Sequence, residues 1–123
     1  MCSSDLPPTR LDPQALARLQ ELDPDGRHGV VPRVLAAYET SLQRMLAQLR
    51  AAQGPALAGV VANVAHTLKS SSASVGALAL AKICAEIEAR LRSGNAATLA
   101  GDLARLIAEC EAAHGAVKAI LRK

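Results

Sequence analysis

Residues 57–77 read LAGVVANVAHTLKSSSASVGA, and this stretch decides the fold. At about 100° of rotation per residue, its apolar side chains form one stripe along a helix, made of Leu57, Val60, Val61, Val64 and Leu68. His66 lies on the opposite, polar side of that helix, so burial cannot explain its imidazole. The stretch therefore predicts an amphipathic helix that presents an accessible histidine and ends at Gly76.

Mostly small residues share the helix face of His66, namely Gly59, Ala62, Asn63, Lys69, Ser70 and Ala73. They leave the imidazole above a smooth and accessible surface, which is what a docking partner requires. This face is therefore predicted to bind a partner. For Asn63 a plain solvated surface position is the simpler alternative.

Helix signals recur on both sides of this stretch. A short helix is predicted to begin at Asp12-Pro13, to end at residues 23–26 and to have an apolar face made of Leu16, Leu19 and Leu22. Longer amphipathic helices are predicted over about 30–52, over 78–92 and from about Ala96 onward. The connections are short, so we expect an all-α fold: an antiparallel up-down-up-down four-helix bundle over residues 11–123, with a short additional N-terminal helix.

Composition restricts the class of protein. The 123 residues suffice for one domain, and half of them are apolar although Tyr38 is the only aromatic residue. The formal net charge of +3 is scattered rather than gathered into a run, so we expect no nucleic-acid partner. No stretch reaches the roughly 20 apolar residues that span a bilayer, and no secretory signal begins the chain. We therefore expect a monomeric domain that does not insert into membranes.

The cysteines and the first residues bear on cellular context. Cys84 and Cys110 fall on apolar helix faces, and three cysteines without a CxxC spacing indicate neither a zinc site nor a disulfide framework. A reducing cytoplasm is expected. Residues 1–6, MCSSDL, resemble a translated sequencing adapter, and residues 1–10 are expected to form a disordered tail. If this start is not native, the natural chain extends further upstream.

The residues around His66 favour phosphoryl chemistry. Near neutral pH much of an unperturbed histidine is uncharged, and one ring nitrogen offers its lone pair to phosphorus. Lys69, one turn on, lies where its charge can offset that of a phosphoryl group. Ser70 is small enough not to crowd the ring, and its hydroxyl can donate to phosphoryl oxygens. For the serines at 71, 72 and 74 a weak helix end is the simpler interpretation.

These residues resemble the histidine-containing phosphotransfer (HPt) domains of bacterial multistep phosphorelays. The family pattern is a histidine, any residue, a leucine, a lysine and a glycine, followed by small polar residues, a glycine-alanine pair and a Leu...Cys...Glu stretch. The matching residues here are His66, Leu68, Lys69, Ser70, Ser71, Ser72, Gly76, Ala77, Leu80, Cys84 and Glu88. Ser70 stands where glycine is usual. We expect phosphotransfer to survive this change, with its effect on partner preference and phosphohistidine lifetime left open.

The resemblance implies that His66 accepts a phosphoryl group from a receiver-domain aspartate and passes it to another receiver. The receiver brings the aspartate and the divalent metal, so we expect no cofactor and no metal site in this chain. In the family, a polar residue at the position of Glu88 can hydrogen-bond the inner ring nitrogen and leave the outer one as nucleophile. Lys69 and Lys82 are expected to aid docking against an acidic receiver pocket.

Other functional classes compete with this interpretation. Glu111 and His114 have the Glu-x-x-His spacing of di-iron bundles, but neither His28 nor His66 has the glutamate three residues before it that a second pair needs. A helical adaptor that docks a receiver or kinase without phosphorylation is the alternative function. Nothing resembles the ATP-binding machinery of a kinase, so a carrier without autokinase activity is expected rather than an enzyme. A free-standing protein and the C-terminal domain of a hybrid sensor kinase are both open.

Overall fold

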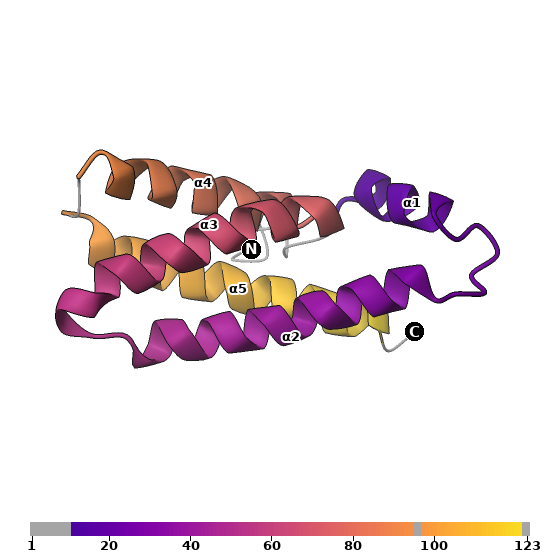
Figure 1. Ribbon diagram of the computed structural model, residues 1–123, viewed down its shortest axis with the longest axis horizontal. Coiled ribbons are helices and arrows are strands. Elements are labelled where there is room, and N and C mark those ends of the chain that lie inside the picture. The colour runs from indigo at the N-terminus through magenta and orange to yellow at the C-terminus, as the bar shows by residue number, and fades with distance from the viewer. Residues whose placement is uncertain (1–10, 95–96, 122–123) are drawn as a thin grey trace, which may run out of the picture.

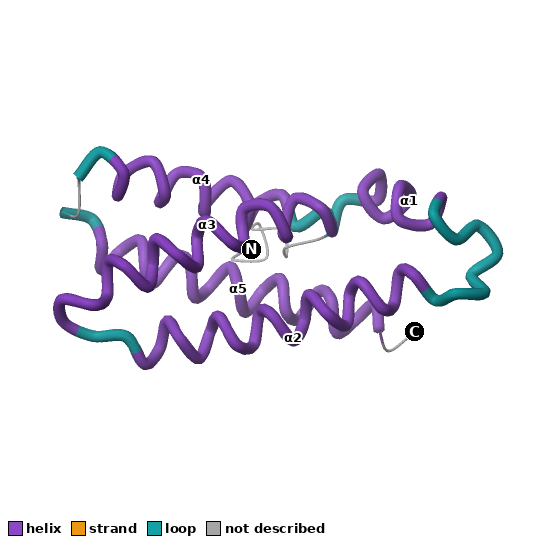
Figure 2. Tube along the Cα trace, viewed as in Figure 1, coloured by secondary structure: helices purple, strands orange, loops and turns teal. Residues whose placement is uncertain are grey.

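The computed structural model describes residues 11–94 and 97–121, which form five α-helices and one short 3-10 helix (Figure 1). The elements are α1 (Pro13–Glu21), α2 (Val30–Ala51), η2 (Gly54–Ala56), α3 (Leu57–Val75), α4 (Leu78–Arg92) and α5 (Leu99–Leu121). Every regular element in these two ranges is helical (Figure 2). The prediction of an all-α fold with a short additional N-terminal helix is confirmed, whereas the predicted tail at 1–10 lies outside the described residues.

The four long helices, α2 to α5, lie along one axis and form the bundle. Successive helices alternate in direction, which is consistent with the expected up-down-up-down order (Figure 1). The most extensive contacts join α3 to α4 and α2 to α5, and α1 lies at the end of the bundle where α3 turns into α4. Among the described residues, α3 and α4 therefore form the most extensively packed pair of helices.

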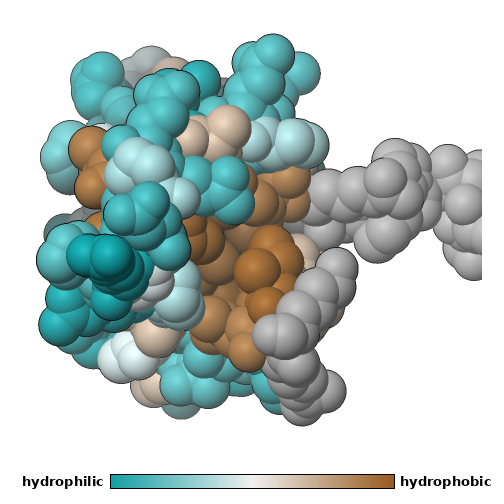
Figure 3. All heavy atoms as spheres, turned by 90° about the vertical axis from the view of Figure 1, so that its right-hand side faces the viewer, coloured by the Kyte–Doolittle hydropathy of each residue, from teal (hydrophilic) through white to brown (hydrophobic). Residues whose placement is uncertain are grey.

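Aliphatic side chains fill the core. The largest fully buried ones come from all four long helices and include Leu35, Leu42, Leu49, Leu68, Leu80, Ile87 and Leu106. At the end of the bundle that carries α1, apolar residues show at the surface within a polar surround (Figure 3). Within α3, Val61, Val64 and Leu68 are completely buried while His66 is exposed. The predicted orientation of this helix is thus confirmed.

The N-terminal helix departs from the prediction at its end. Leu22, expected on the apolar face, is 71% exposed, whereas Leu16 packs against the core as expected and Leu11 and Ala15 are buried. The cause is Asp23, which is buried and whose Oδ2 accepts hydrogen bonds from the amide of His28 in the following loop at 3.0 Å and from the amide of Val30, the first residue of α2, at 3.3 Å. With Asp23 held inward by those amides, the neighbouring Leu22 faces solvent.

The last helix begins later than predicted. The predicted start, near Ala96, lies outside the described residues, and the first described helical residue is Leu99. The helix then continues to Leu121 without interruption, although Gly101 and Gly115 weaken the helical signal. Neither this helix nor any other among the described residues is long and apolar enough to cross a membrane.

Gly76 closes the turn between α3 and α4. It ends α3 with φ +88°, a left-handed conformation that favours glycine, and the next amide, that of Ala77, donates to the Ser72 carbonyl at 2.8 Å. The Gly76 carbonyl accepts a hydrogen bond from the Asp12 amide at 2.8 Å. A Cβ at Gly76 would lie 2.5 Å from that amide nitrogen. This turn therefore fixes how α4 returns along α3 and binds the start of α1 to it.

We expect Gly76→Ala to lower the free energy of unfolding by about 2 kcal/mol or more, because an L residue at positive φ is strained and its Cβ meets Asp12. Gly101→Ala is the matched control, since its Cβ meets nothing within 4 Å inside α5, and it should stabilise by about 0.5–1 kcal/mol. Urea denaturation followed by circular dichroism measures both values. Equal effects of the two substitutions would contradict the role of the turn.

Candidate functional site

His66 stands on the exposed face of α3, with 69% of its side chain accessible. Its Nδ1 lies 2.6 Å from Oε2 of Glu88. Glu88 projects from α4 across the interface between α3 and α4, where the contacts are most extensive. Six of the predicted docking and site residues lie on the same face of α3. Gly59, Asn63, Ser70 and Ala73 are exposed, and Ala62 and Lys69 are half-buried. The imidazole therefore stands accessible above small side chains.

Glu88 joins two cations and the imidazole. Its side chain is only 11% exposed, and its Oε1 accepts a hydrogen bond from Lys69 Nζ at 2.5 Å. Arg92, one turn later on α4, places Nη2 3.3 Å from Oε2. The hydrogen bonds from Lys69 and then from His66 lower the pKa of Glu88 from its ordinary 4.5 to about 2, outweighing the effect of burial. The carboxylate is therefore ionised at neutral pH.

The charge on Glu88 assigns the tautomer of His66. An ionised carboxylate can only accept hydrogen bonds, so the hydrogen between the two side chains belongs to Nδ1. In the neutral imidazole the lone pair then lies on Nε2, the outer nitrogen of an exposed ring. The arrangement supplies one oriented nucleophilic nitrogen.

The second cation, Arg92, was not predicted from the sequence. Its position four residues after Glu88 on a helix is the signal that could have found it, because such pairs lie on the same helix face. The sequence predicts Lys69 as a cation that can offset the charge of a phosphoryl group, and the structure pairs it with Glu88. An ammonium has three donor hydrogens, so this bond leaves Lys69 able to make others.

Two predicted residues make no side-chain contact with Glu88 among the hydrogen bonds and ion pairs of this site. Ser70 is exposed and its carbonyl accepts a hydrogen bond from the Ser74 hydroxyl at 3.1 Å, so its action on a phosphoryl group stays a prediction. Lys82 lies six residues before Glu88 on α4, which separates the two by about 9 Å along the axis and about 120° around it. The structure does not bring Lys82 beside His66, and its part in docking stays a prediction.

Ser72 corrects the interpretation of the serine run as a weak helix end. It is completely buried, and its hydroxyl lies 2.7 Å from the Tyr38 hydroxyl on α2. Burial raises the pKa of Tyr38, so its phenol stays protonated. This bond joins α2 to the helix that carries His66, on the side of α3 away from solvent.

The other histidines have different surroundings. His28 is exposed in the loop before α2. His114 is half-buried between α2 and α5, where its Nε2 lies 3.1 Å from Glu39, and Glu111 is half-exposed and pairs with Arg50. Glu111 and His114 thus do not project together into the core as a di-iron site requires. In residues 11–94 and 97–121 no three or more His, Cys, Asp or Glu side chains are grouped so that they could hold a metal ion.

Comparisons with known proteins point to one family. Residues 33–116 match the Hpt domain family. The chain is similar to the crystal structure of histidine-containing phosphotransfer protein B (HptB) from Pseudomonas aeruginosa PAO1, with 26% sequence identity and a TM-score of 0.77. That similarity covers 95% of this chain and 97% of the other. No curated protein matches the chain. The family match and the structural match both include the two helices that carry His66 and Glu88.

The assigned tautomer can be tested by ¹⁵N NMR of the histidine ring nitrogens in mildly alkaline buffer. Imidazole in water favours hydrogen on Nε2, so the exposed His28 should show that pattern while His66 shows hydrogen on Nδ1. In Glu88→Gln, whose amide can accept or donate, His66 should move toward the pattern of His28. An unchanged His66 spectrum in the variant would show that Glu88 does not set the tautomer.

The lowered pKa of Glu88 also predicts how stability depends on pH. A carboxyl whose folded pKa is about 2 and whose ordinary value is 4.5 stabilises the fold above pH 4.5 and loses that contribution as pH falls through 2. We expect the free energy of unfolding of the wild type to fall more steeply than that of Glu88→Gln over this interval. Urea denaturation at a series of pH values compares the slopes, and parallel curves would contradict the assignment.

Proposed function

Because this chain belongs to the Hpt domain family, we propose that it carries a phosphoryl group on His66 between receiver domains of a multistep phosphorelay. Histidine phosphotransfer is the role of this family in phosphorelays. The observation that supports His66 as the acceptor is the 2.6 Å contact of its Nδ1 with Glu88, which leaves Nε2 as an exposed nucleophile. The carrier is proposed to be a monomer without autokinase activity.

The proposed transfer needs no proton to leave the imidazole. The Nε2 lone pair attacks the phosphorus of a receiver aspartyl phosphate, the N–P bond forms, and the P–O bond to the aspartate breaks with release of its carboxylate. The ring keeps the hydrogen on Nδ1 and becomes positively charged, which strengthens its hydrogen bond to Glu88. In the reverse step a receiver aspartate attacks the phosphorus and the ring leaves as neutral imidazole.

Lys69 and Arg92 are proposed to stabilise the phosphorylated state. Both cations lie against Glu88, the carboxylate that also contacts His66, so they are close to the charge that a phosphoryl group brings. Lys69 is the better placed of the two, because it lies one helical turn after His66 on the same helix. The exposed Ser70 is proposed to leave room for the phosphoryl oxygens, as glycine does in the family pattern.

The proposed partners are receiver domains, which bring the aspartate and a divalent metal ion. The exposed positions of Gly59, Asn63 and Ala73 around His66 support a docking surface without bulky side chains. A surface of this kind fits a transient complex. We also propose a cytoplasmic location, which is supported by Cys84 and Cys110, both free and buried.

The carrier proposal is tested by incubating the protein with magnesium and a receiver domain phosphorylated by acetyl phosphate. Mass spectrometry should find one phosphoryl adduct on the wild type and none on His66→Gln, and the adduct should be labile in acid and stable in base. His28→Gln is the matched control and should be phosphorylated like the wild type, because His28 lies exposed in the loop before α2. ATP without a kinase should give no adduct.

An equally abundant adduct on His66→Gln would assign the phosphoryl group to another residue. If the wild type gave no adduct with any of several receivers but still bound them, the unphosphorylated adaptor function would replace the proposal. Circular dichroism of both variants checks that each remains folded.

A further inference from the structure

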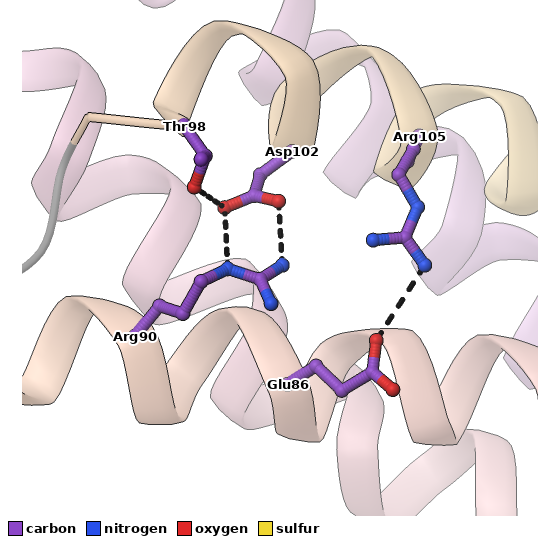
Figure 4. A network of polar contacts seen from close by, with 5 residues as sticks. All are labelled: Glu86, Arg90, Thr98, Asp102 and Arg105. Atoms are coloured by element: carbon purple, nitrogen blue, oxygen red, sulfur yellow. Dashed lines mark hydrogen bonds and ion pairs between the residues drawn. The ribbon is translucent and has the colours of Figure 1, made fainter.

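An ion pair between a half-buried guanidinium and a buried carboxylate joins the end of α4 to the start of α5 (Figure 4). Arg90 donates from Nε to Asp102 Oδ2 at 3.1 Å and from Nη2 to Oδ1 at 2.5 Å, so both carboxylate oxygens are bound by one guanidinium. Thr98 adds a third hydrogen bond, from its hydroxyl to Oδ2, at 3.0 Å. Only 5% of the Asp102 side chain is exposed. The paired and planar geometry restrains Arg90 in both position and orientation.

The charges of this pair also suit their places in the two helices. Asp102 lies in the first turn of α5 and Arg90 in the last turn of α4, where the helix dipoles favour a negative and a positive charge respectively. The Arg90 guanidinium, and then the Thr98 hydroxyl, hold the pKa of Asp102 below its usual range. The pair is therefore ionised. Removing Arg90 would leave the charge of Asp102 without its counterpart at a buried position, and removing the charge of Asp102 would leave a half-buried guanidinium unpaired.

Arg90 belongs to the segment of α4 that forms the candidate site. Glu88 precedes it by two residues, Arg92 follows it by two, and α4 ends at Arg92. The last turn of a helix lacks intrahelical partners for its carbonyls and is the part that opens most readily. Here the Arg90 carbonyl accepts a hydrogen bond from the Ser93 hydroxyl at 2.8 Å, but this cap ties α4 only to itself.

The contact with Asp102 ties this turn of α4 to α5 through two hydrogen bonds from one guanidinium, while Glu88 ties the preceding turn to α3. The other ion pair that Figure 4 shows across the same seam, Glu86 with Arg105, is longer at 3.5 Å and half-exposed on both sides. Asp102 contacts Arg90 and Thr98 on the α5 side of α4, whereas Glu88 contacts His66 on the α3 side. A continuous chain of contacts therefore leads from Asp102 through Arg90 and α4 to Glu88 and His66.

We infer that Asp102 is a positioning residue for His66. By fixing Arg90, it holds the end of α4 in the position that keeps Glu88 bonded to Nδ1 of His66. This inference rests on the proposed function for its kinetic consequence, because transfer requires Nε2 to remain the free nitrogen. Its structural consequence, the tautomer of His66, does not depend on any phosphoryl donor. The two consequences can be measured separately.

The test compares Asp102→Asn with Arg105→Gln, the matched control that removes the half-exposed pair across the same seam. The change from aspartate to asparagine keeps the size of the side chain but removes its charge and one acceptor. We expect Asp102→Asn to shift His66 toward the Nε2-protonated tautomer in ¹⁵N NMR and to slow phosphorylation by a phosphorylated receiver at least about tenfold. Arg105→Gln should change neither. Both are measured at a temperature at which circular dichroism shows them folded.

A double variant tests the route through Glu88. In the Glu88→Gln background, Asp102→Asn should add no further change in tautomer or transfer rate, because the contact that it positions is already gone. If Asp102→Asn does not fold, Thr98→Val removes one hydrogen bond to the same carboxylate without unpairing its charge. That variant should shift the tautomer in the same direction by a smaller amount.

Two results would overturn the inference. The first is a lower melting temperature for Asp102→Asn with the tautomer and transfer rate of the wild type, which would make the ion pair purely structural. The second is an equal slowing of transfer with and without Glu88. Failure of the proposed function gives a different pattern, in which no receiver phosphorylates the wild type although Asp102→Asn still shifts the tautomer.

Discussion

The arrangement of the site depends on one constraint: the nearly buried carboxylate of Glu88 must keep its charge satisfied between two helices. It does so with donors from both sides of the seam, His66 and Lys69 on α3 and Arg92 on its own helix. These donors reach it only if α3 and α4 lie close together and in one register. Gly76 sets how α4 returns along α3, and small buried residues such as Ala65 allow the close approach. The contacts of Glu88 therefore depend on the turn at Gly76.

The helices could be predicted from the sequence, because glycines and the apolar period mark them locally. The contacts between the helices could not. Gly76 and the apolar period located α3 and α4 because both signals act within one turn of helix. Leu22 was placed wrongly, because the loop after α1 is set by the buried Asp23 and not by helical periodicity. The pairing of Arg90 with Asp102 could not be predicted, since it depends on which faces of α4 and α5 meet.

A comparison of two histidines shows why the arrangement matters more than the residue type. His66 and His114 each contact a glutamate, but His66 does so through Nδ1 and His114 through Nε2. Nδ1 is bonded to Cγ, the ring carbon that carries Cβ, and lies nearer the main chain than Nε2, so using it for the carboxylate frees the less hindered nitrogen. In His114 the less hindered nitrogen is occupied, and only 20% of the side chain is exposed. Accessibility and bonding both favour His66 as the nucleophile.

The same contacts suit the imidazole before and after the proposed transfer. Before it, Glu88 orients a neutral ring and is itself held by Lys69 and Arg92, so no charge in the group lacks a partner. In the proposed phosphorylated state the ring would be a cation that Glu88 stabilises, and the two basic side chains beside Glu88 would be available to the phosphoryl oxygens. Under the proposed function, the same side chains would therefore serve transfer in either direction, and the receivers would set the direction of flow.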